Sequence, residues 1–191
     1  MFYRVCKGIV RFVMLFIFRI KTEGKENLPK EGGVIFAVNH KSDFDPVVAA
    51  ICCPRQLNFM AKSELFKNKF FGALIKKLGA FPVHRDSGDV GAFKAALKIL
   101  RDDKVMLIFP EGGRVKKGQK RRAKPGVAMI AQKAGVPVLP VLIDGDYKWM
   151  NKITVKIGKP ISFEEYRSRK LSGDEIQELA DNILESIYAQ G

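Results

Sequence analysis

The chain has 191 residues, 47% of them hydrophobic, and a formal net charge of +14. This length suits one domain with a sizeable core, and the hydrophobic fraction excludes an intrinsically disordered chain. The large positive charge predicts an anionic partner: a membrane surface, a nucleic acid, an acidic protein or a phosphorylated substrate.

Residues 2–20 are strongly apolar, and Arg4, Lys7, Arg11 and Arg19 punctuate or flank them. Arg11 interrupts the roughly 20 apolar residues that a membrane span needs. No small-residue cleavage site follows, which argues against a signal peptide. The segment is therefore a helix in the membrane interface, a helix packed on the core or a span. Its basic residues favour an interfacial amphipathic helix that contacts anionic headgroups.

Beyond this helix, short apolar runs alternate with segments of helical periodicity. In chain order we expect a strand at 34–38, a helix from Asp45-Pro46 to about Pro54, a strand at 57–61, a helix at 63–78, a strand at 80–83, a helix at 91–100, a strand at 105–109, a helix at 126–134, strands at 136–143 and 153–157, and a helix at 173–188. This alternation predicts an α/β fold, with a mostly parallel mixed sheet flanked by helices.

The same pattern divides the chain into three parts. We expect a membrane-associated helix at 1–20, a polar linker at 21–33 and an α/β domain at 34–191. Within the domain, Asp45 is predicted to be a helix N-cap, followed by proline at the first helical position. The strand at 136–143 holds two prolines, so we expect an edge strand or a channel wall, with ordinary core packing as the alternative.

The cysteines and histidines give little sign of a disulfide framework or a metal site. Cys6, Cys52 and Cys53 are odd in number and include an adjacent pair. We therefore expect reduced thiols facing a cytosol. The chain has two histidines and no spaced Cys/His cluster, so we expect no metal.

A histidine and an aspartate lie five positions apart, directly after the strand expected at 34–38. An α/β fold places its chemistry at such strand ends. His40 is able to take a proton while Asp45 holds its ring, which is the base-and-orienter pair of acyl transfer. A simple hydrogen bond within a loop is the alternative interpretation.

A second block, Phe-Pro-Glu-Gly-Gly-Arg at 109–114, follows another expected strand. The paired glycines Gly112 and Gly113 let backbone approach a ligand closely, and Arg114 has a planar group suited to phosphate. Glu111 would accept from a substrate hydroxyl or hold an arginine; a turn closed by a Glu–Arg ion pair is the alternative. Arg85 also follows a strand, so two arginines can converge on one phosphate.

Four blocks in this order and spacing, at 39–46, 79–85, 109–114 and 136–141, resemble the 1-acyl-sn-glycerol-3-phosphate acyltransferase family. That family carries an Asn-His, four residues, Asp block, then a block from Gly to Arg, a Phe-Pro-Glu-Gly-Thr/Ser-Arg block and a Val-Pro-Ile/Val-x-Pro-Val block. The sequence departs from the pattern at Gly113, where the family usually has a hydroxyl-bearing residue.

The resemblance implies transfer of a fatty acyl group from acyl carrier protein or coenzyme A to the sn-2 hydroxyl of lysophosphatidic acid. The product would be phosphatidic acid, in phospholipid biosynthesis. The acyl thioester is a co-substrate, and no cofactor is implied. The catalytic pair would be His40 as the base and Asp45 as its orienter. The residues expected to bind substrates are Arg85, Glu111, Gly112, Arg114 and Lys62.

Within that set, Arg85 and Arg114 would bind the acceptor phosphate and Glu111 would position the glycerol. Lys62, or backbone amides near it, would steady the thioester oxyanion. No acyl-enzyme is expected, because the acceptor hydroxyl is itself the nucleophile.

The expected location is the cytoplasmic face of the cell membrane, as a peripheral or monotopic protein on anionic lipids. The basic loop at 116–124 would extend this face or dock an acidic carrier protein; a solvated loop is the alternative. The acceptor could instead be another glycerophosphate or lysolipid. A non-enzymatic membrane-surface protein and a nucleic-acid-binding protein are alternatives from other classes. The latter is disfavoured because no helix-turn-helix, zinc or aromatic-platform signature occurs.

Overall fold

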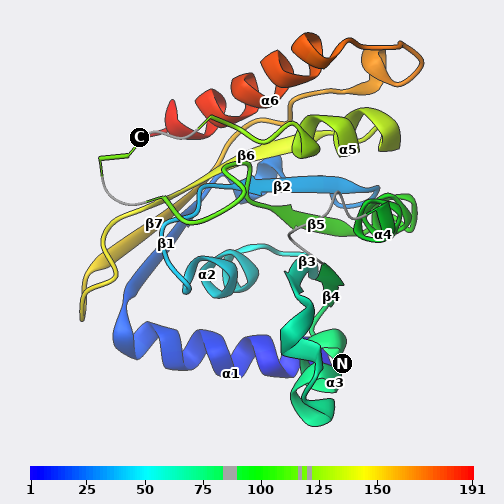
Figure 1. The fold of residues 1–191 in the computed structure, drawn as a ribbon. Coiled ribbons are helices and arrows are strands. Elements are labelled where there is room, and N and C mark those ends of the chain that lie inside the picture. Colours follow the sequence, from blue (N-terminus) through cyan, green and yellow to red (C-terminus); the bar gives the residue numbers. More distant parts are fainter. Residues whose placement is uncertain (84–89, 116–117, 120–121) are drawn as a thin grey trace.

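The computed structural model describes residues 1–83, 90–115, 118–119 and 122–191 (Figure 1). The strands are β1 (Arg19–Glu23), β2 (Val34–Val38), β3 (Leu57–Lys62), β4 (Ala80–Val83), β5 (Val105–Ile108), β6 (Val138–Asp144) and β7 (Lys152–Ile157). The α-helices are α1 (Phe2–Ile17), α2 (Asp45–Cys52), α3 (Lys69–Lys77), α4 (Val90–Arg101), α5 (Gly126–Ala134) and α6 (Gly173–Tyr188). Three short 3₁₀ helices are η1 (Lys25–Asn27), η2 (Ser63–Phe66) and η3 (Glu164–Tyr166).

The strands form one seven-stranded sheet in the order β1-β7-β6-β2-β5-β3-β4. The β6–β7 pair is antiparallel, and the other neighbouring strands run parallel. The predicted α/β fold with a mostly parallel mixed sheet is therefore confirmed. Parallel order brings the carboxyl ends of β2, β3, β4, β5 and β6 to the same edge, where ligands bind in open α/β sheets.

The central strand β2 shows why both faces of the sheet are covered. All five of its residues are buried. Val34, Phe36 and Val38 pack on one face with the core side of α1 and α2, while Ile35 and Ala37 pack on the other with α4, α5 and α6. A run of apolar residues without alternation is expected of a parallel strand buried on both sides. Figure 1 shows α1 and α2 on one side of the sheet and α5 and α6 on the other.

The expected linker at 21–33 begins inside the sheet. Residues 19–23 form β1, which pairs with β7, so that Ile20 lies opposite Ile153. Exposed and half-buried side chains alternate along β1, and its charged residues point to solvent. Charged residues on an edge strand discourage pairing with another chain. They also explain why the sequence suggested a polar linker here.

Strand β6 lies between β7 and β2, so the expectation of an edge strand is wrong. The carbonyl of buried Pro140 accepts a hydrogen bond of 2.8 Å from the N–H of Gly158, directly after β7 ends. The ring nitrogen of Pro140 also faces β7. Because the β6–β7 pairing ends at Val141 and Ile157, the N–H that proline lacks is not needed for a hydrogen bond within that pairing. Pro140 is part of the core, which was the alternative interpretation.

The helix expected at 63–78 is broken into η2 and α3. The side chain of Asn68 accepts a hydrogen bond of 3.0 Å from the N–H of Phe71, and it caps a new helix there. Asparagine is among the strongest N-cap residues, so it ends the apolar periodicity that suggested one helix. The chain leaves the carboxyl end of β3 at Lys62 and enters η2 and α3 directly.

Helix α1 packs on the domain and also keeps an apolar side in solvent. Met14 and the following Phe18 are buried in the core, whereas Phe12 and Phe16 are exposed. Within the described part of the chain, no helix has the length and apolar character needed to cross a membrane. The three cysteines are free thiols.

Candidate active site

His40 and Asp45 are in contact at the carboxyl end of β2. The Nδ1 atom of His40 lies 3.0 Å from Oδ2 of Asp45, and the two side chains are 13% and 0% exposed. A carboxylate only accepts hydrogen bonds, so in the neutral imidazole this contact places the proton on Nδ1 and leaves Nε2 as the acceptor. The imidazole also stacks on Phe109, with ring centroids 3.9 Å apart. This is the orientation a general base requires.

The sequence predicted that Asp45 caps helix α2, but in the structure it does not. The N-cap residue is Phe44, and no side chain caps the helix. The Oδ2 atom of Asp45 instead accepts backbone N–H groups of Lys41 and Ser42, each at 2.6 Å. The loop that carries His40 therefore wraps around this carboxylate. Asp45 positions the base and does not cap the helix.

Tyr147 is the fourth partner of Asp45. Its hydroxyl donates to Oδ1 of Asp45 at 2.7 Å. Burial, followed by the charge of Asp45, raises the pKa of Tyr147 far above its ordinary value, so the hydroxyl stays protonated. Its ring packs edge-on against Phe18, at the end of α1, with centroids 5.4 Å apart.

Glu111 holds the backbone of His40. Its Oε2 accepts the N–H of His40 at 3.0 Å, and the N–H of Val115 donates to the carbonyl of His40 at 2.8 Å. The backbone of His40 thus joins the block at 39–46 to the block at 109–114 and the residue that follows it. Glu111 is 1% exposed, so its carboxylate is buried. This differs from the expectation that it meets the glycerol or closes a turn with an arginine.

The other oxygen of Glu111 is bound by the last residue of α6. The hydroxyl of Tyr188 donates to Oε1 of Glu111 at 2.8 Å. Burial raises the pKa of Glu111, and the hydrogen bonds from Tyr188 and from the backbone oppose this rise. Burial, then the hydrogen bond to Glu111, also raises the pKa of Tyr188. The C-terminal helix therefore supports the loop behind the base.

Asn39 ties the end of β2 to β6. Its side-chain amide donates to the carbonyl of Ile143 at 3.1 Å, and its Oδ1 accepts the N–H of the same residue at 2.7 Å. Asn39 is buried, so these two bonds satisfy its polar atoms. The residue before the base thus has a structural role in this fold.

Gly112 stands where only glycine fits. Its φ is +68°, and a Cβ atom would lie 2.7 Å from Cγ of Lys124. The space expected to admit a ligand is filled by the aliphatic stem of Lys124. The turn is closed by a hydrogen bond of 3.0 Å from the N–H of Gly112 to the carbonyl of Phe109.

Arg114 forms an ion pair with Asp43, in the loop between His40 and Asp45. Both side chains are exposed, so the guanidinium lies at the surface beside the base. Exposed pairs of this kind contribute about 0–1 kcal/mol, which leaves the arginine available to a stronger anion. The structure therefore brings His40 and Asp45 into contact and joins Arg114 to the loop between them.

Lys62 is exposed at the carboxyl end of β3, opposite Val83 of β4. Strand β5 lies between β3 and β2, so Lys62 is two strands from His40, roughly 10 Å along the edge at the usual spacing. It shares the edge with the base without touching it. Arg85 lies outside the described residues, as do Lys116, Lys117, Lys120 and Arg121 of the basic loop.

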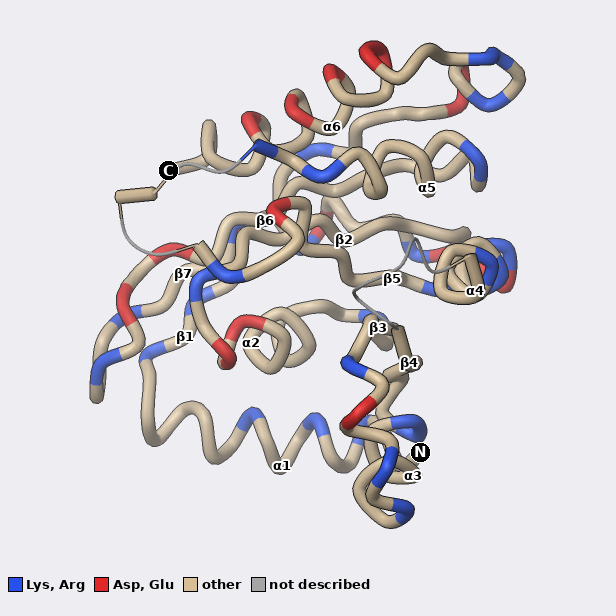
Figure 2. Tube along the Cα trace, in the orientation of Figure 1, with Lys and Arg blue, Asp and Glu red and all other residues tan. Residues whose placement is uncertain are grey.

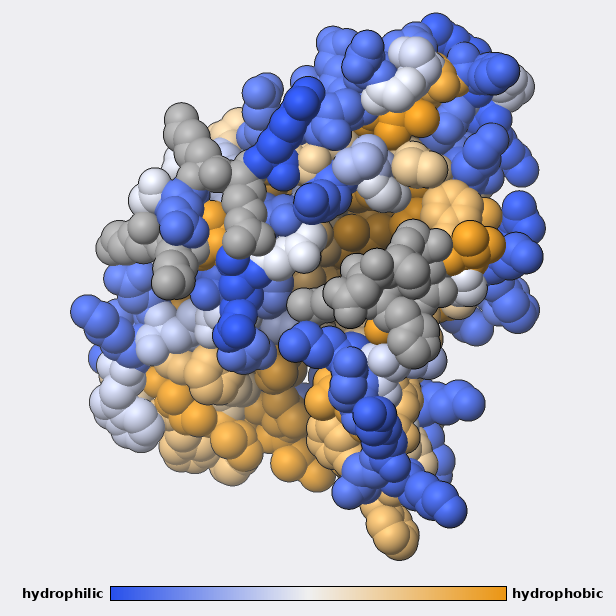
Figure 3. Space-filling view, in the orientation of Figure 1, coloured by the Kyte–Doolittle hydropathy of each residue, from blue (hydrophilic) through white to orange (hydrophobic). Residues whose placement is uncertain are grey.

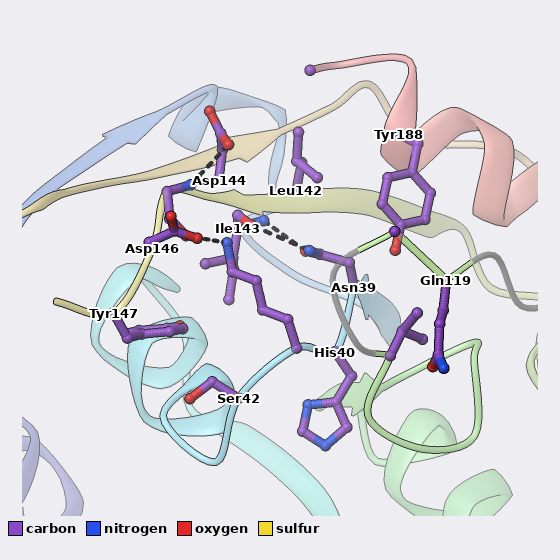
Figure 4. A pocket seen from close by; sticks show the side chains of 15 residues that line it. Asn39, His40, Ser42, Gln119, Leu142, Ile143, Asp144, Asp146, Tyr147 and Tyr188 are labelled. Atoms are coloured by element: carbon purple, nitrogen blue, oxygen red, sulfur yellow. Dashed lines mark hydrogen bonds between the residues drawn. The ribbon is translucent and has the colours of Figure 1, made fainter.

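A cavity of about 810 Å³ opens beside His40 and is large enough for a lipid headgroup or part of a thioester. Figure 4 shows its walls, with Asn39 and His40 from the end of β2, Tyr147 after β6 and Tyr188 from α6. Among the described residues, no cluster of three His, Cys, Asp or Glu side chains has the arrangement of a metal site.

Sequence reasoning missed Asp43, Tyr147 and Tyr188. Tyr147 follows the carboxyl end of β6, so the strand-end rule that selected His40 would also have selected it. Tyr188 ends a helix far from the other blocks in sequence, and no local pattern marks it.

Known proteins resemble this chain in sequence and in structure. The model of a family described as Acyltransferase matches residues 19–144, from β1 to the end of β6. A 1-acyl-sn-glycerol-3-phosphate acyltransferase of Bacillus subtilis is 30% identical over 165 residues, covering 83% of this chain and 82% of the relative. A protein of the same name from Streptococcus pneumoniae is 29% identical over 192 residues, covering 96% of this chain and 70% of the relative.

A solved structure gives the same answer. The crystal structure of the 1-acyl-sn-glycerophosphate (LPA) acyltransferase PlsC from Thermotoga maritima superposes with a TM-score of 0.76 at 25% identity. The alignment covers 98% of this chain and 77% of that one. Fold, site and matches together define the protein as an acyltransferase. The chain belongs to the 1-acyl-sn-glycerol-3-phosphate acyltransferase family, which confirms the resemblance carried by its four blocks.

Proposed function

We propose that this acyltransferase moves a fatty acyl group from a thioester of acyl carrier protein or coenzyme A to the sn-2 hydroxyl of lysophosphatidic acid. One observation carries the proposal: Nδ1 of His40 is held by the buried carboxylate of Asp45, so Nε2 is free to accept a proton. The names of the relatives support the acceptor class, and an exposed arginine on the loop of the base supports phosphate binding.

The reaction follows from these positions. The acceptor hydroxyl oxygen attacks the thioester carbonyl carbon while its proton passes to Nε2 of His40. Asp45 stabilises the imidazolium that forms. The carbon–sulfur bond then breaks, and the departing sulfur takes the proton back from His40. The ester oxygen is the acceptor's own, so no covalent enzyme intermediate is needed.

Arg114 would leave Asp43 and bind the acceptor phosphate in a bidentate arrangement, and Arg85 would add a second contact. Lys62, from its place on the same edge, would face the thioester. Glu111 and Gly112 would act behind the base, where they fix the loop of His40, rather than on the glycerol. Holding reactants in this way can lower a barrier by several kcal/mol, on the order of 7–11 at the extreme.

The membrane is the source of the acceptor in this proposal. Residues 1–20 would form the membrane-associated part, because α1 exposes Phe12 and Phe16 while arginines and lysines flank its apolar run. The protein would then act as a peripheral protein at the cytoplasmic face of the cell membrane, on anionic lipids.

The deciding experiment assays the purified full chain against lysophosphatidic acid, glycerol-3-phosphate and a neutral lysolipid. Each acceptor is combined with acyl carrier protein and coenzyme A thioesters. We expect phosphatidic acid from lysophosphatidic acid and little product from the neutral lysolipid. A clear preference for glycerol-3-phosphate or for the neutral acceptor would overturn the assignment of the acceptor, and the donor arm identifies the carrier.

A further inference from the structure

Helix α3 has an apolar surface that the described chain leaves uncovered. The buried residue of this nine-residue helix is Gly72. Phe70 is 91% exposed, and Phe71 and Leu74 are exposed as well. A helix this short is marginal in water unless its apolar side is packed. Exposed aromatic residues gathered on such a helix mark a surface that meets a partner.

This surface adjoins the exposed side of α1. The Nζ atom of Lys77, at the end of α3, lies 5.7 Å from the ring centroid of Phe2, at the start of α1. Phe12, on α1, is 64% exposed. Figure 1 places both helices at the same end of the molecule, and Figure 3 shows hydrophobic atoms gathered over that end.

Basic residues dominate the charges around the two helices, with Glu64 of η2 as the acidic residue next to α3. The sequence has no acidic residue in 1–22 or in 65–83. The basic residues next to or within α3 are Lys67, Lys69, Lys76 and Lys77. Acidic residues are instead spread along α6, at the opposite end of the molecule (Figure 2). This arrangement complements an anionic lipid surface, since lysines reach headgroups while aromatic rings enter the acyl boundary. Two copies of the face would repel each other.

We propose that α3 is a second membrane-inserting element, and that α1 and α3 together seat the chain on an anionic bilayer. The proposal rests on the proposed function in one respect, that α1 meets the membrane. Because α3 follows the carboxyl end of β3 through η2, its insertion would hold at the lipid surface the same sheet edge that carries His40. The acceptor lipid would then reach the base without leaving the bilayer.

The test is co-sedimentation of the full chain with vesicles of phosphatidylglycerol and phosphatidylcholine. Phe70→Ser should weaken partitioning by about tenfold, which corresponds to about 1.4 kcal/mol, while the fold is unchanged because the side chain is exposed. Met129→Ser is the matched control, since Met129 is an exposed apolar residue on α5, and it should change partitioning by less than about twofold.

Phe12→Ser separates this inference from the proposed function. If Phe12→Ser weakens partitioning and Phe70→Ser does not, the role of α3 is overturned while that of α1 stands. If the unaltered chain does not sediment with the vesicles, the membrane roles of α1 and α3 are both overturned. The proposal would also be overturned if the chain forms a dimer without lipid, and Phe70→Ser dissociates this dimer while vesicle partitioning is unchanged. The face would then belong to a contact with a second copy.

A spectroscopic readout gives an independent check. The chain has one tryptophan, so Phe70→Trp in a Trp149→Phe background reports on α3 alone. Its emission should shift to shorter wavelength on vesicles and be quenched by brominated acyl chains. Emission that is unchanged on vesicles to which the protein is bound would overturn insertion of α3.

Discussion

Tyr147 joins the base to the N-terminal helix. Its hydroxyl donates to Asp45 at 2.7 Å, and its ring packs against Phe18, the residue that ends α1. The loop that carries Tyr147 is also fixed to this point by the N–H of Met150, which donates to the carbonyl of Ile17 at 2.8 Å. The end of the proposed membrane helix and the carboxylate behind the base are therefore one packed unit.

Tyr147→Phe should lower kcat by about tenfold with little change in KM. The ring still fills its place, but one of four hydrogen bonds to the buried Asp45 is lost. A hydrogen bond to a charged group contributes about 1.5–3 kcal/mol, so the free energy of unfolding should also fall, towards the lower end of that range because three bonds remain. Steady-state kinetics and urea unfolding measure the two effects.

Tyr166→Phe serves as the matched control, because Tyr166 lies in η3, far along the chain from the base. It should leave kcat unchanged. The comparison of kcat with stability gives a second readout, because a tyrosine that only packs would change the free energy of unfolding without lowering kcat. An equal kcat in Tyr147→Phe and in the unaltered protein would show that the tyrosine only packs.

Most of the fold could be predicted from the sequence, because the central elements obey local rules. The helix predicted at 173–188 has the bounds of α6, and in the structure Ser172 and Glu175 form a capping box that starts it. Strand β1 could not be predicted, because its single inward apolar residue, Ile20, gives no periodic signal. The place of β6 inside the sheet depended on where β7 ends, which is a tertiary property.

The candidate site was predictable only in part, for a similar reason. His40 and Asp45 are five residues apart, so a local pattern could suggest their contact. The bonds that hold them come from residues distant in sequence: Tyr147 is 102 residues from Asp45, and Tyr188 is 77 residues from Glu111. No spacing in one chain reveals such contacts. The sequence also could not show that Glu111 faces inward, because a buried carboxylate and a substrate-binding one look alike in a motif.

His40→Ala should reduce transfer by at least a hundredfold, the usual contribution of a general base. Binding to anionic vesicles should be unchanged, because His40 lies in neither α1 nor α3 and its side chain is mostly buried. Activity is measured as thioester consumption, and binding as co-sedimentation. Transfer that survives within tenfold of the unaltered protein would remove His40 from the role of base.

Glu111→Gln should change how stability depends on pH. Below the ordinary pKa of 4.5 the carboxyl is protonated in both the folded and the unfolded chain. As the pH rises, the unfolded chain loses this proton first, because burial raises the pKa of Glu111 in the folded chain. The free energy of unfolding therefore falls until the pH passes the raised pKa. Glutamine does not ionise, so this part of the fall should disappear.

Urea unfolding across mildly acidic and neutral pH checks the effect as a difference between the two proteins. Other carboxyls cancel in that difference, including Glu175 and Asp181, whose pKa values are lowered by hydrogen bonds. If stability depends on pH in the same way in both proteins, the carboxyl of Glu111 is not the group that burial perturbs.

Asp43→Asn should strengthen the binding of phosphate-bearing acceptors. In the substrate-free chain, Asp43 pairs with Arg114, so an incoming phosphate must displace a carboxylate. Exposed pairs contribute about 0–1 kcal/mol, so removing the charge should lower KM for lysophosphatidic acid by up to about fivefold and leave kcat unchanged. Arg114→Ala should raise the same KM. Neither change should alter the KM for a neutral lysolipid, because no phosphate charge is at stake there. If Asp43→Asn lowers KM for neutral and charged acceptors alike, Asp43 shapes the entrance to the site rather than competing for the arginine.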